Sequence, residues 1–428
     1  MQIIDNPTPS EWPSLLTRPA FEAKALQNTV KEILFNVKTR GDQALFEYNT
    51  EFDKADITDL QVSPVEIKEA IQQVDDALKE AIKTAANNIR AFHKAQGRDM
   101  LTVETMPGVT CWRKSIPIQN VGIYIPGGTA PLFSTVLMLA IPASLAGCEE
   151  IVLCTPPQAD GSINPVILFT AGLVGVKKLY KTGGAQAVAA MAYGTDTIPK
   201  VSKIFGPGNQ FVTEAKQQVS LEGIAIDMPA GPSEVAIIAD ASADASFIAA
   251  DLLSQAEHGV DSQVLLICTD HDKVKEVNTE IEKQLSQLPR QEIAQQSLQN
   301  SKAVVMKDLE RAVEISNAYA PEHLIICTAD SGEVADKITN AGSVFIGAYT
   351  PESAGDYASG TNHTLPTNGA AMAYSGVSLD SFMKQVTYQK IDAEGLRKLG
   401  PVIEKMAEAE QLEAHKRAVS IRLEKIGR

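Results

Sequence analysis

From about Ser115 onward, the sequence alternates short apolar runs, most of which end in Gly or Pro, with stretches whose pattern suits a helix. Strands that alternate with helical stretches of about 10–15 residues are typical of a parallel sheet covered on both faces. We therefore predict an α/β, doubly wound architecture. The runs are VGIYIPGG (121–128), IVLC (151–154), KLYKTGGAQ (178–186), KIFGPGNQ (203–210), EVAIIAD (234–240), QVLLIC (263–268), KAVVM (302–306), HLIIC (323–327) and SVFIG (343–347).

Nine strands are many for one open sheet, and the segment MPAGPSE (228–234) interrupts their rhythm near the middle. No fixed sequence period indicates a duplication, so a division at this point rests on rhythm alone. We predict two related, incomplete Rossmann-like α/β domains with a helical region before them and a helical arm after them. The predicted boundaries are 1–114 for the helical region, 115–232 and 233–380 for the two α/β domains, and 381–428 for the arm.

Charged residues interleaved at helical spacing predict helices between Thr29 and about Ala95, and again over Ile391–Glu410 and Leu412–Lys425. The C-terminal arm has too little apolar surface to fold alone. We therefore expect it to pack on the body of the protein or on a second subunit.

Composition excludes several classes of function. The net charge is -15, with 38 Lys and Arg against 53 Asp and Glu, so we expect no nucleic-acid partner. No stretch approaches the roughly 18 apolar residues of a membrane span, and the N-terminus lacks the pattern of a signal peptide. The five cysteines form no CxxC pair. These features predict a cytoplasmic protein that does not enter a membrane.

Three glycine-containing loops follow predicted strands, at 124–128, 183–186 and 206–209. Ligands of open α/β sheets collect at the carboxyl ends of strands, where glycines let main-chain N–H groups approach a pyrophosphate. The GxGxxG fingerprint is absent, and such glycines also serve plain turns. The loops therefore leave NAD, another nucleotide and simple turns all open.

Gln255 lies in a predicted helix, Ala243–Glu257, which Gly259 can close as a left-handed cap, and His258 stands at the end of this helix. Their spacing places both side chains on the same face, beside Asp251, so they can reach one point in space. The alternative is a histidine stabilised by the end of the helix.

Glu322 and His323 lie at the start of the predicted strand HLIIC. Two ionisable groups at this place do not contribute to an apolar core. A carboxylate beside an imidazole supplies two proton carriers with different pKa values, as acid-base catalysis requires. A solvated helix–strand junction explains the pair equally well. Asp356 lies in a predicted loop of about a dozen residues without an apolar run, which is typical of a functional segment.

Seven motifs, taken in order, closely resemble the histidinol dehydrogenase family over nearly the whole chain. Among them, IDMPAGPSE followed by SQAEHG is highly specific. The motifs are VGIYIPGGTAPLFSTVLM, KIFGPGNQFVTEAK, IDMPAGPSEV, DLLSQAEHG, PEHLI, ESAGDYASGTNH and AEAEQLEAHK.

The resemblance implies a role for each matching position. Gln255, His258, Asp356 and His415 correspond to ligands of one Zn²⁺ per subunit, and Glu322 and His323 to the acid-base pair. Tyr124, Gln186 and Asn209 correspond to positions that contact NAD. The positions that correspond to substrate contacts are Ser233, Gln255, His258, His323, Asp356, Glu410 and His415.

The resemblance also implies the reaction and the assembly. L-Histidinol is oxidised through L-histidinaldehyde to L-histidine, the end product of histidine biosynthesis, and two NAD are consumed. His323 takes the hydroxyl proton and Glu322 activates the water that attacks the aldehyde. A homodimer with a swapped C-terminal arm would bring His415 to the partner's site, and the 115–232 domain would bind NAD.

Two other classes of function compete with this interpretation. A zinc hydrolase also uses a metal beside a Glu and a His, although the HExxH motif is absent. A non-catalytic nucleotide- or metal-binding module would leave the Glu322–His323 pair unexplained.

Overall fold

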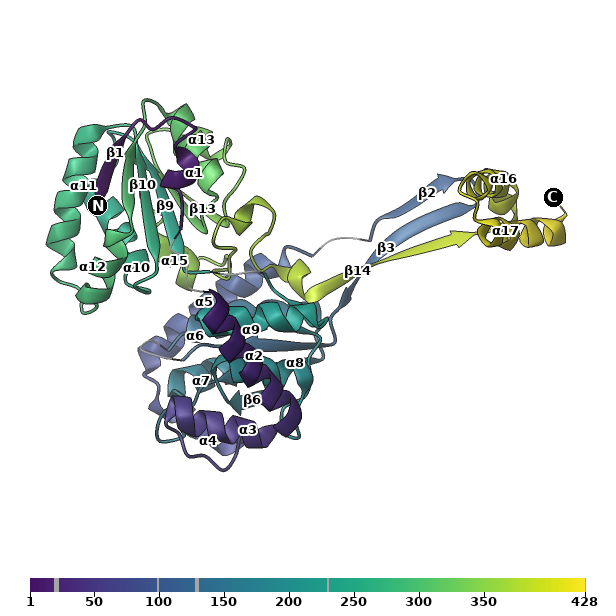
Figure 1. The fold of residues 1–428 in the computed structure, drawn as a ribbon, viewed down its shortest axis with the longest axis horizontal. Coiled ribbons are helices and arrows are strands. Elements are labelled where there is room, and N and C mark those ends of the chain that lie inside the picture. The colour runs from purple at the N-terminus through teal and green to yellow at the C-terminus, as the bar shows by residue number, and fades with distance from the viewer. Residues whose placement is uncertain (19–22, 98–99, 128–130, 229–230, 428) are drawn as a thin grey trace. The chain divides into compact units, whose positions relative to one another are not determined.

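A computed structural model describes the chain in two compact units. The first comprises residues 1–96 and 118–382, and the second comprises residues 97–117 and 383–428. Figure 1 shows the path of the chain, coloured from purple at the N-terminus to yellow at the C-terminus. The described residues are 1–18, 23–97, 100–127, 131–228 and 231–427.

The first parallel sheet lies in the middle of the sequence. Its strand order is β6-β5-β4-β7-β8, so β4 stands at the centre and the chain moves outward in both directions from it. This is the arrangement of half a doubly wound fold. The strands are β4 (Asn120–Tyr124), β5 (Glu150–Thr155), β6 (Lys178–Lys181), β7 (Lys203–Phe205) and β8 (Ala225–Ile226); the helices between them are α6 (Phe133–Ala146), α7 (Pro165–Leu173), α8 (Gly184–Tyr193) and α9 (Gln210–Leu221).

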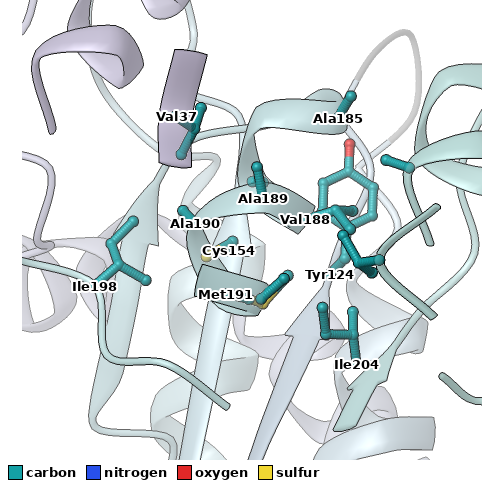
Figure 2. Packing of buried hydrophobic residues seen from close by; sticks show 14 of the residues in the cluster. Val37, Tyr124, Cys154, Ala185, Val188, Ala189, Ala190, Met191, Ile198 and Ile204 are labelled. Carbon is teal, nitrogen blue, oxygen red and sulfur yellow. The ribbon is translucent and has the colours of Figure 1, made fainter. Parts of the chain in front are cut away.

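Helices from the N-terminal part of the chain pack against this sheet. Val37, Met191 and Ile204 are fully buried in one apolar cluster that joins an N-terminal helix, α8 and β7 (Figure 2). These N-terminal helices are α2 (Ala23–Arg40), α3 (Asp42–Tyr48), the π-helix η1 (Asn49–Asp53), α4 (Pro64–Gln73) and α5 (Asp76–Lys94). The short helix α1 (Trp12–Leu15) packs instead on an apolar cluster of the second parallel sheet.

The second parallel sheet has the order β1-β11-β10-β9-β12-β13. Counted from β9, it repeats the order of the first sheet, with β1 from the N-terminus added at one edge. The strands are β1 (Gln2–Asp5), β9 (Glu234–Ala239), β10 (Gln263–Cys268), β11 (Lys302–Val305), β12 (His323–Cys327) and β13 (Ser343–Ile346); the helices are α10 (Ala245–Ala256), α11 (His271–Leu285), α12 (Gln291–Gln299), α13 (Leu309–Tyr319), α14 (Ser331–Ala335) and α15 (Glu352–Tyr357).

The second unit is an antiparallel sheet of order β14-β3-β2 with a helical hairpin. Trp112 stacks on Tyr388 across the sheet, and a Cβ added to Gly400 would lie 2.8 Å from Leu423, so the two helices pack closely at that glycine. The elements are β2 (Thr102–Met106), β3 (Val109–Pro117), β14 (Met383–Ile391), α16 (Ala393–Ala409) and α17 (Glu413–Ile426).

The predicted α/β class and all nine predicted strands are confirmed. The sequence analysis missed β1, β8 and the three strands of the second unit. It also predicted a left-handed cap at Gly259, which is wrong: α10 ends at Ala256, and Gly259 has no positive φ. Among the described residues, no helix is long and apolar enough to cross a membrane.

Candidate active site

Glu322 directly precedes β12, and His323 is the first residue of that strand, where its pairing with β9 begins. The two residues are 6% and 4% exposed, respectively. The Glu322 carboxylate accepts a hydrogen bond of 3.0 Å from the Glu234 main-chain N–H, and it lies 3.7 Å from His323 Nδ1. The predicted acid-base pair is therefore buried rather than solvated.

Two further carboxylates flank the same imidazole. Glu352 Oε1 lies 3.6 Å from His323 Nδ1, and Asp356 Oδ1 lies 3.4 Å from His323 Nε2. Glu352 and Asp356 are four residues apart in α15, so both point from one face of that helix. Three acids thus surround one histidine.

Burial and mutual charge shift every member of this cluster. Burial raises the pKa of Glu322 to about 8 and that of Glu352 to about 8, although the charge of His323 opposes both shifts. Burial disfavours the imidazolium, but the charges of the three acids outweigh it and raise the pKa of His323 to about 10. Burial likewise opposes ionisation of Asp356, yet the polar contact with His323 and the charge of that ring hold its pKa below the ordinary range.

Helix α10 carries Gln255 and packs beside α15, where Ser254 donates a 3.3 Å hydrogen bond to Glu352. Gln255 is fully buried, and neither its amide oxygen nor its amide nitrogen has a partner among the described residues. His258 follows the helix and is exposed. Protein atoms near the ring still displace part of its hydration and lower its pKa, which the charge of Asp356 opposes. A neutral imidazole is the form that binds a metal.

These orphaned atoms favour a metal at this point, because buried polar groups are nearly always paired. Asp356 Oδ1 and His323 Nε2 also lack a hydrogen-bond partner in the part of the chain that the structure describes. Ligand atoms of His323, Glu352 and Asp356 lie within 4.8 Å of one another and form one possible donor set. The sequence predicts a different set, which includes Gln255, His258 and Asp356, and imidazole, amide and carboxylate donors suit zinc.

A second feature, a cavity of about 740 Å³, opens at the carboxyl ends of the first sheet. Its size is that of a small-molecule or cofactor site. Tyr124, Gln186 and Asn209 all line it, together with Gly127, Gly184 and Phe211. Gly128 lies outside the described residues.

Close main-chain packing shapes this cavity. Gly206 has a φ of 127°, and a Cβ there would lie 2.1 Å from the Tyr124 carbonyl oxygen, so only glycine fits. The Tyr124 hydroxyl accepts a 3.1 Å hydrogen bond from the Gly184 N–H and points toward the end of α8 that carries Ala185 (Figure 2). Asn209 Oδ1 caps α9, which leaves its amide nitrogen for a ligand.

Comparison with known proteins identifies the family. Residues 16–423 match the family described as histidinol dehydrogenase. The chain is 59% identical over 426 residues to histidinol dehydrogenase of Bacteroides fragilis, covering 100% of both, and 54% identical over 419 residues to that of Escherichia coli, covering 97% of this chain and 96% of the relative. The chain belongs to the histidinol dehydrogenase family. It is therefore a member of an oxidoreductase family.

A solved structure supports the same assignment at the level of the fold. The crystal structure of histidinol dehydrogenase from Elizabethkingia anophelis matches with a TM-score of 0.98 and 56% identity, covering 100% of this chain and 99% of the other. The α/β fold of this family member is thus shared over its whole length.

Most of the predicted site residues fall into two groups. One group surrounds His323 in the second sheet, and the other, Tyr124, Gln186 and Asn209, lines the cavity of the first sheet. Ser233 precedes β9 and is half-buried; residues 229–230, just before it, lie outside the described residues. Glu410 and His415 are exposed in the second unit, and their roles stay predictions.

Sequence reasoning missed Glu352 and misplaced Asp356. The segment was predicted as a loop, whereas Glu352–Tyr357 forms the short helix α15. Pro351 before the helix and two acids at a spacing of four were the available signals, because that spacing places both carboxylates on one helical face. The loop that follows is anchored by His363, whose Nδ1 lies 2.9 Å from the Asp356 carbonyl oxygen and whose Nε2 lies 3.1 Å from Thr135 Oγ1.

Proposed function

We propose that this chain catalyses the NAD-dependent, zinc-requiring oxidation of L-histidinol through L-histidinaldehyde to L-histidine. The observation that carries the proposal is the buried cluster of Glu322, His323 and Asp356 beside the unpartnered Gln255, in a member of the histidinol dehydrogenase family. Such a cluster offers both proton carriers and metal donors.

Gln255, His258 and Asp356 would hold one zinc ion, and His415 of a second subunit would complete the set. Zinc, when bound, would anchor and orient the imidazole and amino nitrogens of the substrate. The support for this set over the one with Glu352 and His323 is the buried amide of Gln255, of which neither polar atom has a partner among the described residues. In Glu352 only Oε1 lacks a hydrogen-bond partner, because Oε2 accepts from Ser254. The set also leaves His323 free to move protons.

The first oxidation converts the alcohol to the aldehyde. His323 accepts the hydroxyl proton while a hydride leaves the same carbon, and NAD supplies the hydride acceptor in both oxidations. His323 must be neutral for this step, whereas its three neighbouring acids favour the charged form. Neutralising the Asp356 carboxylate by its use as a ligand removes one of those charges and favours the neutral base.

The second oxidation adds water. Glu322, as the carboxylate, takes a proton from a water molecule that attacks the aldehyde carbon, and the resulting hydrate loses a second hydride to give the acid. None of the five cysteines, all of which the structure describes, lines the cavity of the first sheet or belongs to the cluster around His323, so the aldehyde is not expected to pass through a bond to sulfur.

NAD would bind in the 740 Å³ cavity at Tyr124, Gln186 and Asn209. Its place at the carboxyl ends of the first sheet, beside the amino ends of α8 and α9, suits a pyrophosphate. A homodimer with a swapped arm and a cytoplasmic location belong to the same proposal, as does the absence of nucleic-acid and membrane partners.

One assay tests the proposal. Purified protein with L-histidinol and NAD should produce two reduced nicotinamides per substrate; a chelator should stop the reaction and zinc should restore it. A protein that hydrolyses amides without NAD would be a zinc hydrolase instead. Binding of NAD or zinc without any turnover of histidinol would indicate a non-catalytic module.

A further inference from the structure

Arg18 contacts two residues that are close to the acid-base pair, Glu234 and Tyr319. Its guanidinium donates hydrogen bonds to both carboxylate oxygens of Glu234, the one from Nη2 measuring 3.1 Å. Nη2 also donates to the Tyr319 carbonyl oxygen at 2.7 Å, and the guanidinium lies 4.0 Å from the centre of the Tyr319 ring. A planar guanidinium that binds a carboxylate through two nitrogens fixes the direction of its partner, which a lysine cannot do.

The buried Glu234 carboxylate accepts hydrogen bonds from three residues. It is 2% exposed, and besides Arg18 it accepts a 2.9 Å hydrogen bond from the Tyr319 hydroxyl and a 2.8 Å hydrogen bond from the Asn368 N–H. One charged pair thus joins three segments: the start of β9, the turn before β12, and the loop at residue 368.

One of these segments, the start of β9, contacts the acid-base pair directly. The Glu234 N–H donates to Glu322 Oε2 at 3.0 Å, and the Glu234 carbonyl oxygen lies 3.4 Å from His323 Nδ1. A proton on Nδ1 can therefore point at this carbonyl, which would leave Nε2 as the free base. The main chain of Glu234 thus contacts both members of the pair.

The turn before β12 is strained. Ala320, between Tyr319 and Glu322, has a φ of 51° in the left-handed region, which is unfavourable for a residue with a Cβ. Such a conformation persists only where its surroundings impose it. The hydrogen bond from Arg18 to the Tyr319 carbonyl ends one residue before Ala320, so it holds the turn where the strain begins.

We propose that Arg18 is a positioning residue for this reaction: through the Glu234 carboxylate and the Tyr319 carbonyl, it fixes the main-chain groups that orient Glu322 and His323. The proposal rests on the proposed function, in which those two residues move the protons. Arg18 itself touches neither of them in any contact that the structure describes, so it is not a catalytic residue.

The test compares Arg18→Met and Arg18→Lys with the control Arg311→Met. Arg311 also pairs with a glutamate, Glu314, but on an exposed face of α13. Displacing a catalytic group by about 1 Å can cost about 10²-fold in rate. We expect Arg18→Met to lower kcat for both oxidations by about that factor, with KM for histidinol and NAD and the zinc content close to those of the control. Arg18→Lys should recover part of kcat, since it keeps the charge but not the two-nitrogen contact.

A second measurement does not depend on turnover. Protein labelled with ¹⁵N in its six histidines gives few imidazole signals, and the His323 signal is identified by its loss in His323→Gln. Arg18→Met should shift that signal, while Arg311→Met should not. An inactive wild-type protein with this pattern would overturn the proposed function and leave the positioning role supported.

Three outcomes would overturn the positioning role. One is a folded, zinc-containing Arg18→Met with the kcat of Arg311→Met; another is an unshifted His323 signal in that variant. If Arg18→Met does not fold, Arg18→Lys decides: a wild-type kcat, or failure of this variant to fold as well, would give Arg18 a role in stability alone.

Discussion

Replacing Glu322 with glutamine should separate the two oxidations. Alcohol oxidation needs a base for the hydroxyl proton but no water, whereas aldehyde oxidation needs water to form the hydrate. Glutamine keeps the size of the side chain and can still accept the hydrogen bond from the Glu234 N–H. It cannot take a proton from water, so the aldehyde step should suffer far more.

The magnitude follows from the role and from the pKa. Loss of a general base typically costs about 10²–10⁴ in rate. Burial raises the pKa of Glu322 to about 8, so roughly one carboxylate in ten is ionised at pH 7. Because the ionised form is the base, aldehyde oxidation by the unaltered enzyme should rise about tenfold between pH 7 and pH 9. Glu322→Gln should lose this rise.

The assay supplies histidinol and histidinal separately and follows nicotinamide reduction from pH 6 to pH 9. His323→Ala serves as the matched variant, because it should impair alcohol oxidation by a similar factor. Zinc content is measured in each preparation so that metal loss is not mistaken for lost proton transfer. Equal losses on both substrates in Glu322→Gln would refute the role of Glu322 in water activation. They would indicate that Glu322 instead positions His323.

Other changes test the metal, the arm and the cofactor cavity. The unaltered protein should hold about one zinc ion per chain; Gln255→Ala should lose most of it, whereas Glu352→Gln should keep it. Metal analysis that finds the reverse would favour the donor set of His323, Glu352 and Asp356. Equal mixing of inactive His415→Ala and His258→Ala subunits should restore about one quarter of the sites if the arm is swapped, and no recovery from verified mixed dimers would contradict the swap. Gly206→Ala should cost about 1–3 kcal/mol of stability and raise KM for NAD, since its Cβ would clash with the main chain; an unchanged melting temperature and KM would argue against that clash.

The sequence predicts the two parallel sheets well because their strands are buried on both faces. All six residues of β9 are buried, and such a strand appears in the sequence as one continuous apolar run. The strands of the second unit leave no such signal: β14 (MKQVTYQKI) is largely exposed, and it pairs with β3, more than 260 residues earlier. Long-range pairing of mixed polar strands cannot be inferred from local pattern. The edge strand β1 was also missed, because it is only four residues long and pairs with β11, which is distant in the sequence.

The sequence predicts which residues belong to the candidate site, but it does not predict how they are placed relative to one another. Helical spacing predicts that Gln255 and His258 share one face, although α10 ends at Ala256 and His258 follows it. Nothing local indicates that α15 would stand against β12 and place Glu352 beside His323, because that contact depends on how distant elements pack. The resemblance supplied the individual positions, and the structure adds the burial and charge that set their pKa values.

The acid-base pair occupies the amino ends of β9 and β12, although ligands of open α/β sheets usually collect at the carboxyl ends. A buried carboxylate needs hydrogen-bond donors, and the first N–H of β9, on Glu234, is directed to Glu322 while the Glu322 carbonyl accepts from Ser343. This main-chain donor satisfies the carboxylate without bringing a full positive charge of its own. A lysine or arginine in the same place would hold the pKa of Glu322 down and leave a weak base. Arg18 pairs instead with the side chain of Glu234, the same residue whose N–H contacts Glu322, so the positive charge stays separate from the group that moves protons.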